Sequence, residues 1–188
     1  EALARGGDVL LLVPEIAITA QLIARLERIF GSRVTAYHSK LTLARRTESY
    51  LRLTRSDGGE LVVGARSALF LPLRHLQLIV VDEEHDTGYK QTDAQPRYNA
   101  RDVAVVMARL REARTVLGSA TPSLESYANA LSGKYGLATL DERYGDARTP
   151  LVLVSDTLRA VKRNERKTHF NRLLLDKLAD VLARGEQA

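Results

Sequence analysis

The stretch at residues 78–85 constrains the fold of this chain more than any other. It opens with four aliphatic residues, Leu-Ile-Val-Val, a composition typical of a strand that is buried on both faces. Three carboxylates and a histidine follow directly: Asp82, Glu83, Glu84 and His85. Ligands of open α/β sheets bind where the strands end, and carboxylates placed there can hold Mg²⁺ on a nucleotide and orient an attacking water. The pattern therefore predicts an ATP-driven motor.

Strand-like and helix-like segments alternate up to about residue 135, which predicts an α/β fold with a mainly parallel sheet. Hydrophobic periodicity and turn residues locate the individual elements. We expect strands at 8–13, 33–37, 60–63, 76–81 and 115–117. We expect helices at 18–30 and 42–55, across 103–110 and across 124–131.

The alternation weakens in the last part of the chain. We expect short strands near 137–140 and at 151–154, a basic connector at 159–172, and a final helix across 173–182. The domain boundary is predicted at 145–150, which gives a main domain at 1–148 and a connector with the start of a second domain at 149–188. Both ends of the chain read as helix exits, so we expect it to be the middle of a longer protein.

Length and composition set loose limits on function. A chain of 188 residues fits one domain, or one domain and part of a second. The net charge of +5, from 28 Lys and Arg against 23 Asp and Glu, favours a polyanionic partner only weakly. The absence of cysteine excludes disulfides and thiolate metal sites within these residues. No apolar run approaches the roughly 20 residues that span a bilayer, so we expect no membrane partner and a cytoplasmic location.

Four motifs stand at the predicted carboxyl ends of strands, so the fold would gather them along one edge of the sheet. They lie at 13–19, 63–70, 82–85 and 118–122. Their order and spacing resemble motifs Ia, Ib, II and III of superfamily 2 helicases, in that sequence. With the residues at 86–91 and 97–102 included, nearly the whole chain resembles the PriA family of primosomal replication-restart helicases.

This resemblance implies a RecA-like three-layer α/β sandwich that uses ATP and Mg²⁺. Asp82 would bind the magnesium ion, Glu83 would polarise the hydrolytic water, and His85 would sense the nucleotide state. Motif III residues Ser119 and Thr121 would couple hydrolysis to strand movement. Hydroxyls, Arg and amides at helix starts suit phosphate contacts without sequence preference. The residues implied to face the DNA backbone are Pro14, Glu15, Thr19, Arg66 and Ser67.

An aromatic-rich loop follows motif II and interleaves aromatic with cationic side chains, a mixture that suits base stacking with phosphate contact. Its residues are Tyr89, Lys90, Gln91, Arg97, Tyr98 and Arg101. In the family that the chain resembles, this loop links DNA binding to ATP hydrolysis. The alternative is that Tyr89 and Tyr98 only pin a long loop to the domain.

Several of these residues also have structural interpretations. Thr19 is an equally good helix N-cap, and Thr121 before Pro122 fits an N-cap with proline at the first helical position. Asn99 with Asp102 fits a variant of the capping box. A metal-dependent hydrolase is a further alternative, although no partner ligands stand at recognisable spacing. Its ligands would be Asp82, Glu84, His85 and Asp86.

The sequence contains no G-x-x-x-x-G-K-[ST], the loop that cradles the β- and γ-phosphates of a nucleotide. The resemblance implies that this loop lies upstream of residue 1. It also implies a second motor domain and a cysteine-rich Zn²⁺ module downstream of residue 188. We therefore predict that this chain alone does not turn over ATP.

The parent protein implied by the resemblance is an ATP-dependent DNA helicase. It would recognise and remodel stalled replication forks and initiate primosome assembly for replication restart. Its implied partners are forked and single-stranded DNA, single-strand DNA-binding protein and primosome proteins at the nucleoid. Two alternatives stay open. One is a catalytically inactive DNA-binding scaffold, against which Asp82 and Glu83 argue. The other is a DExH translocase on duplex DNA in a restriction or remodelling complex, against which the aromatic-rich loop argues.

Overall fold

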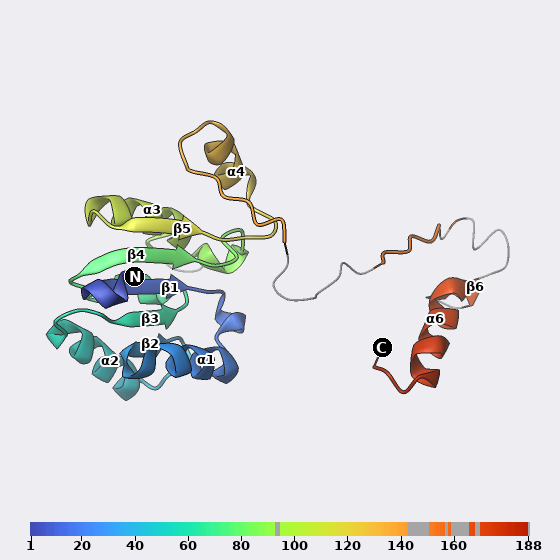
Figure 1. Ribbon diagram of the computed structural model, residues 1–188, viewed down its shortest axis with the longest axis horizontal. Coiled ribbons are helices and arrows are strands. Elements are labelled where there is room, and N and C mark those ends of the chain that lie inside the picture. The colour runs from blue at the N-terminus through green and yellow to red at the C-terminus, as the bar shows by residue number, and fades with distance from the viewer. Residues whose placement is uncertain (93–94, 143–150, 157, 159–165, 168–169, 188) are drawn as a thin grey trace. The chain divides into compact units, whose positions relative to one another are not determined.

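Figure 1 shows a computed structural model of the chain, which describes residues 1–92, 95–142, 151–156, 158, 166–167 and 170–187. The chain divides into two compact units, residues 1–137 and 138–188, each described by itself. The predicted boundary at 145–150 lies outside the described residues. The assignment of 1–148 and 149–188 to successive helicase domains stays a prediction.

The first unit is built on a five-stranded sheet in which every neighbouring pair is parallel. The strands are β1 (Asp8–Leu12), β2 (Val34–Tyr37), β3 (Leu61–Gly64), β4 (Leu76–Val81) and β5 (Arg114–Leu117). Their order is β2-β3-β1-β4-β5, so the motif II strand lies between the motif Ia and motif III strands. All five predicted strands of this unit, and the parallel sheet, are confirmed.

Four helices of this unit begin after a side chain that accepts a hydrogen bond from the first turn. They are α1 (Ala20–Phe30), α2 (Leu43–Arg55), α3 (Ala100–Leu110) and α4 (Leu124–Leu131), capped by Thr19, Thr42, Asn99 and Ser123. The capping interpretation is confirmed for Thr19 and Asn99. It is wrong for Thr121, because Ser123 takes the cap position and the Thr121 amide donates to Ser119 Oγ at 3.0 Å.

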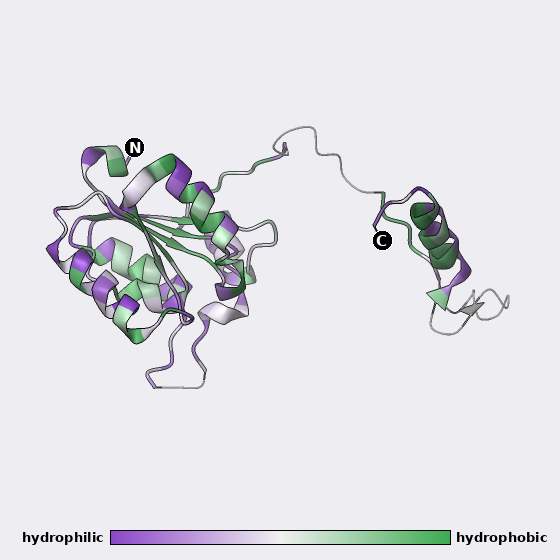
Figure 2. Ribbon diagram, turned by 90° about the horizontal axis from the view of Figure 1, so that it is seen from below, coloured by the Kyte–Doolittle hydropathy of each residue, from purple (hydrophilic) through white to green (hydrophobic). Residues whose placement is uncertain are grey.

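Helices cover both faces of the sheet. Alternate residues of each strand point to opposite sides, so both faces present apolar side chains that a helix can bury. On one side, Val9 and Val63 belong to a cluster that includes Leu22, Ile23 and Leu26 of α1. On the other side, Leu10, Leu12, Val62, Ile79 and Val81 pack with Leu53 of α2 and with Ala100, Ala104 and Ala108 of α3. The central strands β1, β3 and β4 are accordingly hydrophobic along most of their length, whereas the helices alternate between hydrophobic and hydrophilic residues (Figure 2). The expected three-layer α/β sandwich with a mainly parallel sheet is confirmed.

Short 3₁₀ helices occupy many of the connections. They are η1 (Leu3–Arg5), η2 (Glu15–Ala17), η3 (Gly31–Arg33), η4 (Arg66–Phe70) and η5 (Thr87–Tyr89). Three of them, η2, η4 and η5, follow the strands that carry motifs Ia, Ib and II. Gly64 permits this arrangement, because a Cβ there would collide with the Ala68 side chain and lie 2.5 Å from the Tyr37 carbonyl oxygen.

The strands predicted near 137–140 and at 151–154 are wrong, since these described residues form no strand. Leu140 is 93% exposed and Val154 is 91% exposed, so neither apolar run gains the burial that stabilises a strand. The second unit instead contains an antiparallel pair, β6 (Arg166–Lys167) and β7 (Phe170–Asn171), followed by α6 (Arg172–Ala183).

The final helix is confirmed, but the connector predicted at 159–172 contains the strand pair of the second unit. Residues 159–165 and 168–169 of that connector lie outside the described ranges. Among the described helices, none combines the length and the apolar character needed to cross a membrane.

Candidate functional site

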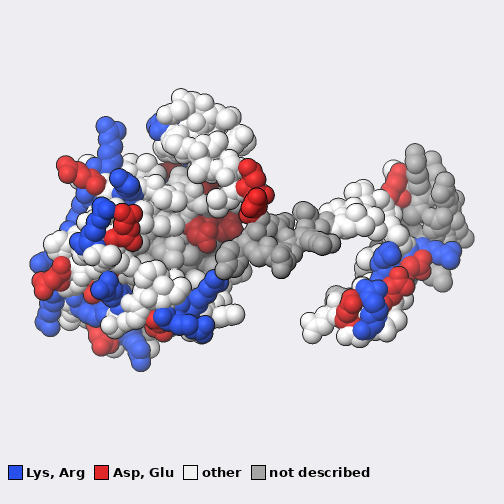
Figure 3. Space-filling model, viewed as in Figure 1, with Lys and Arg blue, Asp and Glu red and all other residues white. Residues whose placement is uncertain are grey.

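The carboxyl ends of the parallel strands lie along one edge of the sheet, and the four motifs follow them there (Figure 1). Because of the strand order, the motifs run along this edge as Ib, Ia, II and III. Figure 3 shows acidic side chains gathered at the end of the first unit towards which the strands run. Most of the Lys and Arg visible on this unit lie elsewhere. The motif II end is therefore an acidic edge that suits a cation.

Motif II begins where the pairing of β4 ends. The Asp82 amide donates to the Leu12 carbonyl at 2.9 Å, and the Asp82 carboxylate accepts from the Glu83 amide at 3.0 Å. Glu83 has a φ of 47°, in the left-handed region that residues other than glycine seldom adopt. Such backbone conformations cluster at functional sites. This turn leaves the side chains of Asp82 and Glu83 exposed to solvent, where a ligand can reach them.

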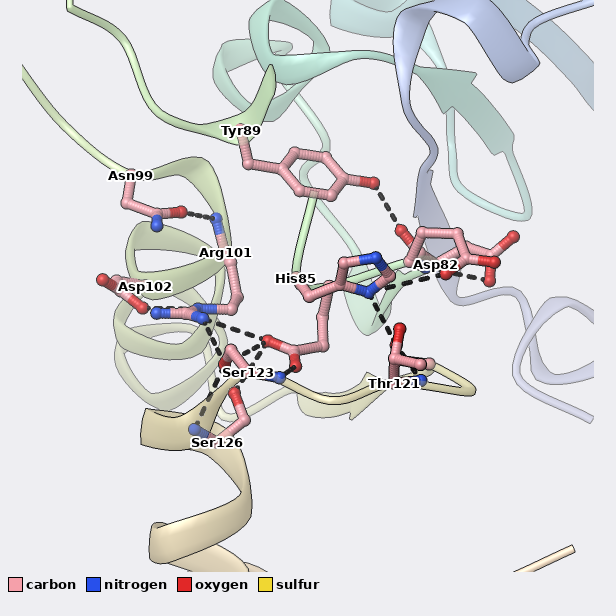
Figure 4. Close-up of polar contacts among 12 residues, drawn as sticks. Asp82, His85, Tyr89, Asn99, Arg101, Asp102, Thr121, Ser123 and Ser126 are labelled. Carbon is pink, nitrogen blue, oxygen red and sulfur yellow. Dashed lines mark hydrogen bonds and ion pairs between the residues drawn. The ribbon is translucent and has the colours of Figure 1, made fainter. Parts of the chain in front are cut away.

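Motifs II and III are in direct contact through their side chains. His85 Nδ1 lies 2.7 Å from Ser119 Oγ and 3.6 Å from Glu83 Oε2. Ser119 Oγ also accepts from the Thr121 amide (Figure 4). The five residues predicted to bind the metal, polarise water and couple hydrolysis are thus brought together at the ends of β4 and β5.

Tyr89 of the aromatic-rich loop is buried rather than available for stacking. Its side chain is 2% exposed, and its hydroxyl donates to the Asp82 carbonyl at 2.7 Å. Burial raises the pKa of Tyr89, and the negative charges of Asp82, Asp86 and Glu83 raise it further. The prediction that Tyr89 stacks on a base is wrong in this structure, because the ring supports motif II from inside the protein.

The rest of the loop is fastened to η4. Arg66 Nη1 donates to the Lys90 carbonyl at 3.0 Å, so this side chain points to the loop as well as to the edge. The rings of Phe70 and Tyr98 meet edge to face with centroids 5.4 Å apart. Burial raises the pKa of Tyr98, although the nearby Arg66 charge opposes that shift. Motif Ib and the aromatic-rich loop are therefore held together by one hydrogen bond and one aromatic contact.

The exposed members of the loop are Lys90 and Arg97, whereas Gln91 is half-buried. The Gln91 amide donates to the Tyr98 carbonyl at 2.8 Å, and Lys90 and Asn99 form an antiparallel bridge beside it. Its side chain donates to the Pro96 carbonyl at 3.1 Å. Lys90 and Arg97 are therefore the two predicted loop cations whose side chains are open to solvent.

Motif Ia separates into a buried and an exposed part. Pro14 is buried, so the prediction that it faces a DNA backbone is wrong. Glu15 is exposed and accepts a hydrogen bond from the Ser39 hydroxyl, which lies in the turn after β2. Thr19 is exposed, but its hydroxyl oxygen already accepts a hydrogen bond from the Leu22 amide at 3.1 Å. Ser67 of motif Ib is exposed.

Glu84 has a structural role that its sequence position did not reveal, and Arg101 lies outside the loop to which it was assigned. Arg101 does not belong to the loop: it lies in the first turn of α3, and its Nη1 donates to Glu84 Oε2 at 3.0 Å (Figure 4). The Glu84 carboxylate also accepts from the Ser123 amide at 2.6 Å and from the hydroxyls of Ser123 and Ser126 at 3.0 and 2.8 Å. Asp102, expected in a capping box, accepts instead from Arg101 Nε at 2.8 Å.

The pKa shifts of Glu84 and Arg101 both favour the charged forms that pair in this buried network. Burial alone would raise the pKa of Glu84, but the bonds from Ser123, Ser126 and Arg101 outweigh it and leave the pKa lowered. For Arg101, burial acts to lower the pKa, and the contacts with Asp102 and Glu84 raise it overall. One signal in the sequence pointed this way: a cation in the first turn of a helix opposes the helix dipole and needs an anion nearby.

The acidic edge has few of the ligands that a protein-held metal ion needs. The described residues contain no group of three or more His, Cys, Asp and Glu that could hold a metal ion. The metal-dependent hydrolase alternative therefore lacks a ligand set there, and its ligand Glu84 is turned towards Arg101. A magnesium ion that takes most of its ligands from phosphates and water needs only one or two carboxylates, which the exposed Asp82 fits.

Comparison with known proteins agrees with these observations. Residues 1–130 match the DEAD/DEAH box helicase family. The replication restart protein PriA of Chlamydia pneumoniae is 44% identical over 188 residues, which are 100% of this chain and 25% of that protein. The PriA proteins of Chlamydia trachomatis and Bacillus subtilis are each 42% identical over 100% of this chain, and over 25% and 23% of their own lengths. The chain thus spans about a quarter of these relatives, and the expected resemblance is confirmed.

Proposed function

This chain belongs to the DEAD/DEAH box helicase family, and from that premise we propose that it forms part of an ATP-dependent DNA helicase that restarts replication at stalled forks. The similarity to proteins named replication restart protein PriA supports the choice within the family. The proposed partners are forked and single-stranded DNA, single-strand DNA-binding protein and other primosome proteins. The proposed location is the cytoplasm, at the nucleoid.

One observation carries the proposal: the contact of motif II with motif III at neighbouring strand ends. Glu83 and Asp82 are exposed, and His85 lies 2.7 Å from Ser119. Asp82 would hold the Mg²⁺ of ATP, which would neutralise charge on the phosphates. Glu83 would accept the proton of the attacking water. His85 would transmit the change at the nucleotide to Ser119 and the segment that contains Thr121.

We propose that the DNA backbone lies over the ends of β3 and β1, beside the catalytic residues. Exposed Ser67, Lys90 and Arg97 suit phosphate contacts that carry no sequence information. Arg66 would both approach a phosphate and hold the aromatic-rich loop, since it already contacts the Lys90 carbonyl. Glu15 would act indirectly, because a carboxylate repels phosphate; its bond to Ser39 supports the turn that presents Lys40.

The test is the substitution Glu83→Gln in the full-length protein. We expect DNA-stimulated ATP hydrolysis to fall by about 10²–10⁴-fold, the usual contribution of a general base, while forked DNA still binds. Glu27→Gln, an exposed position on α1, is the matched control and should leave hydrolysis unchanged. Hydrolysis at the wild-type rate in Glu83→Gln would contradict the catalytic assignment. Stronger stimulation by blunt duplex than by forked DNA would favour a duplex translocase.

A further inference from the structure

Glu84 joins three elements that are distant in the sequence. It stands at the end of β4, Arg101 comes from the first turn of α3, and Ser123 and Ser126 come from the start of α4. Its side chain is 1% exposed and its oxygens accept from four donors. A carboxylate engaged in this way cannot reach a nucleotide, so its role differs from that of Asp82 and Glu83.

The segment at 119–122, which carries the motif III residues, is attached to motif II at both ends (Figure 4). At its start, Ser119 Oγ lies 2.7 Å from His85 Nδ1. Directly after its end, the Ser123 amide donates to Glu84 Oε1 at 2.6 Å. Because Glu84 and His85 are adjacent in the sequence, a movement of motif II displaces both ends of this segment together.

We infer that Glu84 is a positioning residue, which holds the start of α4 against motif II so that the segment at 119–122 follows the catalytic carboxylates during hydrolysis. The inference rests on the proposed ATP hydrolysis and adds a residue to it. Glu84 acts through Ser123 and never touches the nucleotide. In its absence, His85 would hold the segment at one end only.

Helix capping alone does not account for this buried charge pair. The Ser126 amide is already satisfied by the Ser123 hydroxyl at 3.3 Å. Removing a carboxylate and a guanidinium from water costs free energy that an apolar pair of similar volume would not. A link that transmits position needs several directional bonds at once, and an ionised carboxylate supplies them.

The first experiment compares Glu84→Gln with wild type in the full-length protein. An amide cannot accept from all four donors, so we expect kcat for DNA-stimulated ATP hydrolysis to fall by about tenfold or more. The KM for ATP and the Kd for forked DNA should not change, because neither ligand contacts Glu84. The matched control is Glu125→Gln, which removes an exposed carboxylate from the first turn of α4 and should keep kcat.

A double variant separates positioning from stability. Glu84→Leu combined with Arg101→Met removes both buried charges together, so the thermal midpoint should recover relative to Glu84→Gln. We expect kcat to stay low, because the directional link to Ser123 is still lost. If kcat recovers along with the midpoint, Glu84 has a structural role only and the inference is overturned.

A milder pair of variants keeps the ion pair and does not depend on the fold tolerating its loss. Ser126→Ala removes one donor to Glu84 and should lower kcat by about threefold to tenfold. Ser132→Ala, just beyond the other end of α4, should not lower it. Equal kcat values in both variants and wild type would overturn the inference. Wild-type protein without DNA-stimulated hydrolysis would instead overturn the proposed function itself.

Discussion

At the scale of single residues, the Tyr89 hydroxyl has the most direct influence on motif II among the loop residues. Tyr89→Phe keeps the buried ring but removes its bond to the Asp82 carbonyl. We expect a loss of about 1 kcal/mol in the free energy of unfolding, measured by urea denaturation. Tyr50→Phe, at an exposed position on α2, is the control. A Tyr89→Phe protein as stable as the control would show that this bond contributes nothing net.

The same hydroxyl gives that experiment a pH dependence. The fold raises the pKa of Tyr89 above its ordinary value of 10.0, so the folded state keeps the proton that the unfolded state releases. The resulting stability is complete below pH 10.0 and is lost as the pH rises through the folded-state pKa. The stability difference between wild type and Tyr89→Phe should therefore shrink above pH 10.0.

The direction of side chains is what the sequence could not predict at this scale. Asp82, Glu83 and His85 are exposed where their strand ends, whereas Glu84 is buried, and nothing in the spacing distinguishes Glu84 from Glu83. The left-handed turn at Glu83 ends the strand alternation, so the burial of Glu84 depends on the distant Arg101. Tyr89 was likewise ambiguous, because a tyrosine among cations is equally consistent with a stacking surface and a buried anchor.

At the scale of elements, one buried carboxylate ties three strands together at the edge opposite the site. Asp8 of β1 accepts from the Glu60 amide before β3 and from the His75 amide before β4, each at 3.0 Å. An amide side chain cannot accept at both positions, so Asp8→Asn should lower the free energy of unfolding by about 1–3 kcal/mol. The measurement is denaturant unfolding.

The matched control for Asp8 is Asp57→Asn, an exposed residue in the turn before β3. It should leave the free energy of unfolding unchanged. In the full-length protein, DNA-stimulated hydrolysis by the folded Asp8→Asn variant should also be normal, because Asp8 lies at the amino ends of the strands. A stability equal to that of Asp57→Asn would mean that the Asp8 bonds are replaced by water at no cost.

The elements of the first unit were predictable because local and global signals agree in them. The three central strands β1, β3 and β4 are mostly apolar runs with a neighbour on each side, and Thr19 and Asn99 are caps that act within a few residues. The strands expected near Leu140 and Val154 failed because an apolar run alone does not specify a partner. Thr121 failed as a cap because Ser123 competes for the same role with the help of Glu84.

At the scale of the whole molecule, the sequence contains the residues proposed to hold the metal and activate the water but no G-x-x-x-x-G-K-[ST] for the phosphates. We therefore expect purified residues 1–188 to show no ATP hydrolysis above background with forked DNA, measured by phosphate release. Circular dichroism should show that the same protein is folded. Hydrolysis that is stimulated by DNA and abolished by Glu83→Gln would contradict this prediction.

The backbone at Glu83 has a consequence for how this position can vary through evolution. A φ of 47° is costly for any β-branched residue, so valine, isoleucine and threonine are disfavoured before chemistry is considered. Asparagine, aspartate and glycine suit the conformation better, yet none has a carboxylate at the distance of glutamate. Substitution at position 83 is therefore limited both by the backbone conformation and by the need for a carboxylate at the length of glutamate. In a relative that has lost catalysis, we expect asparagine or glycine at this position.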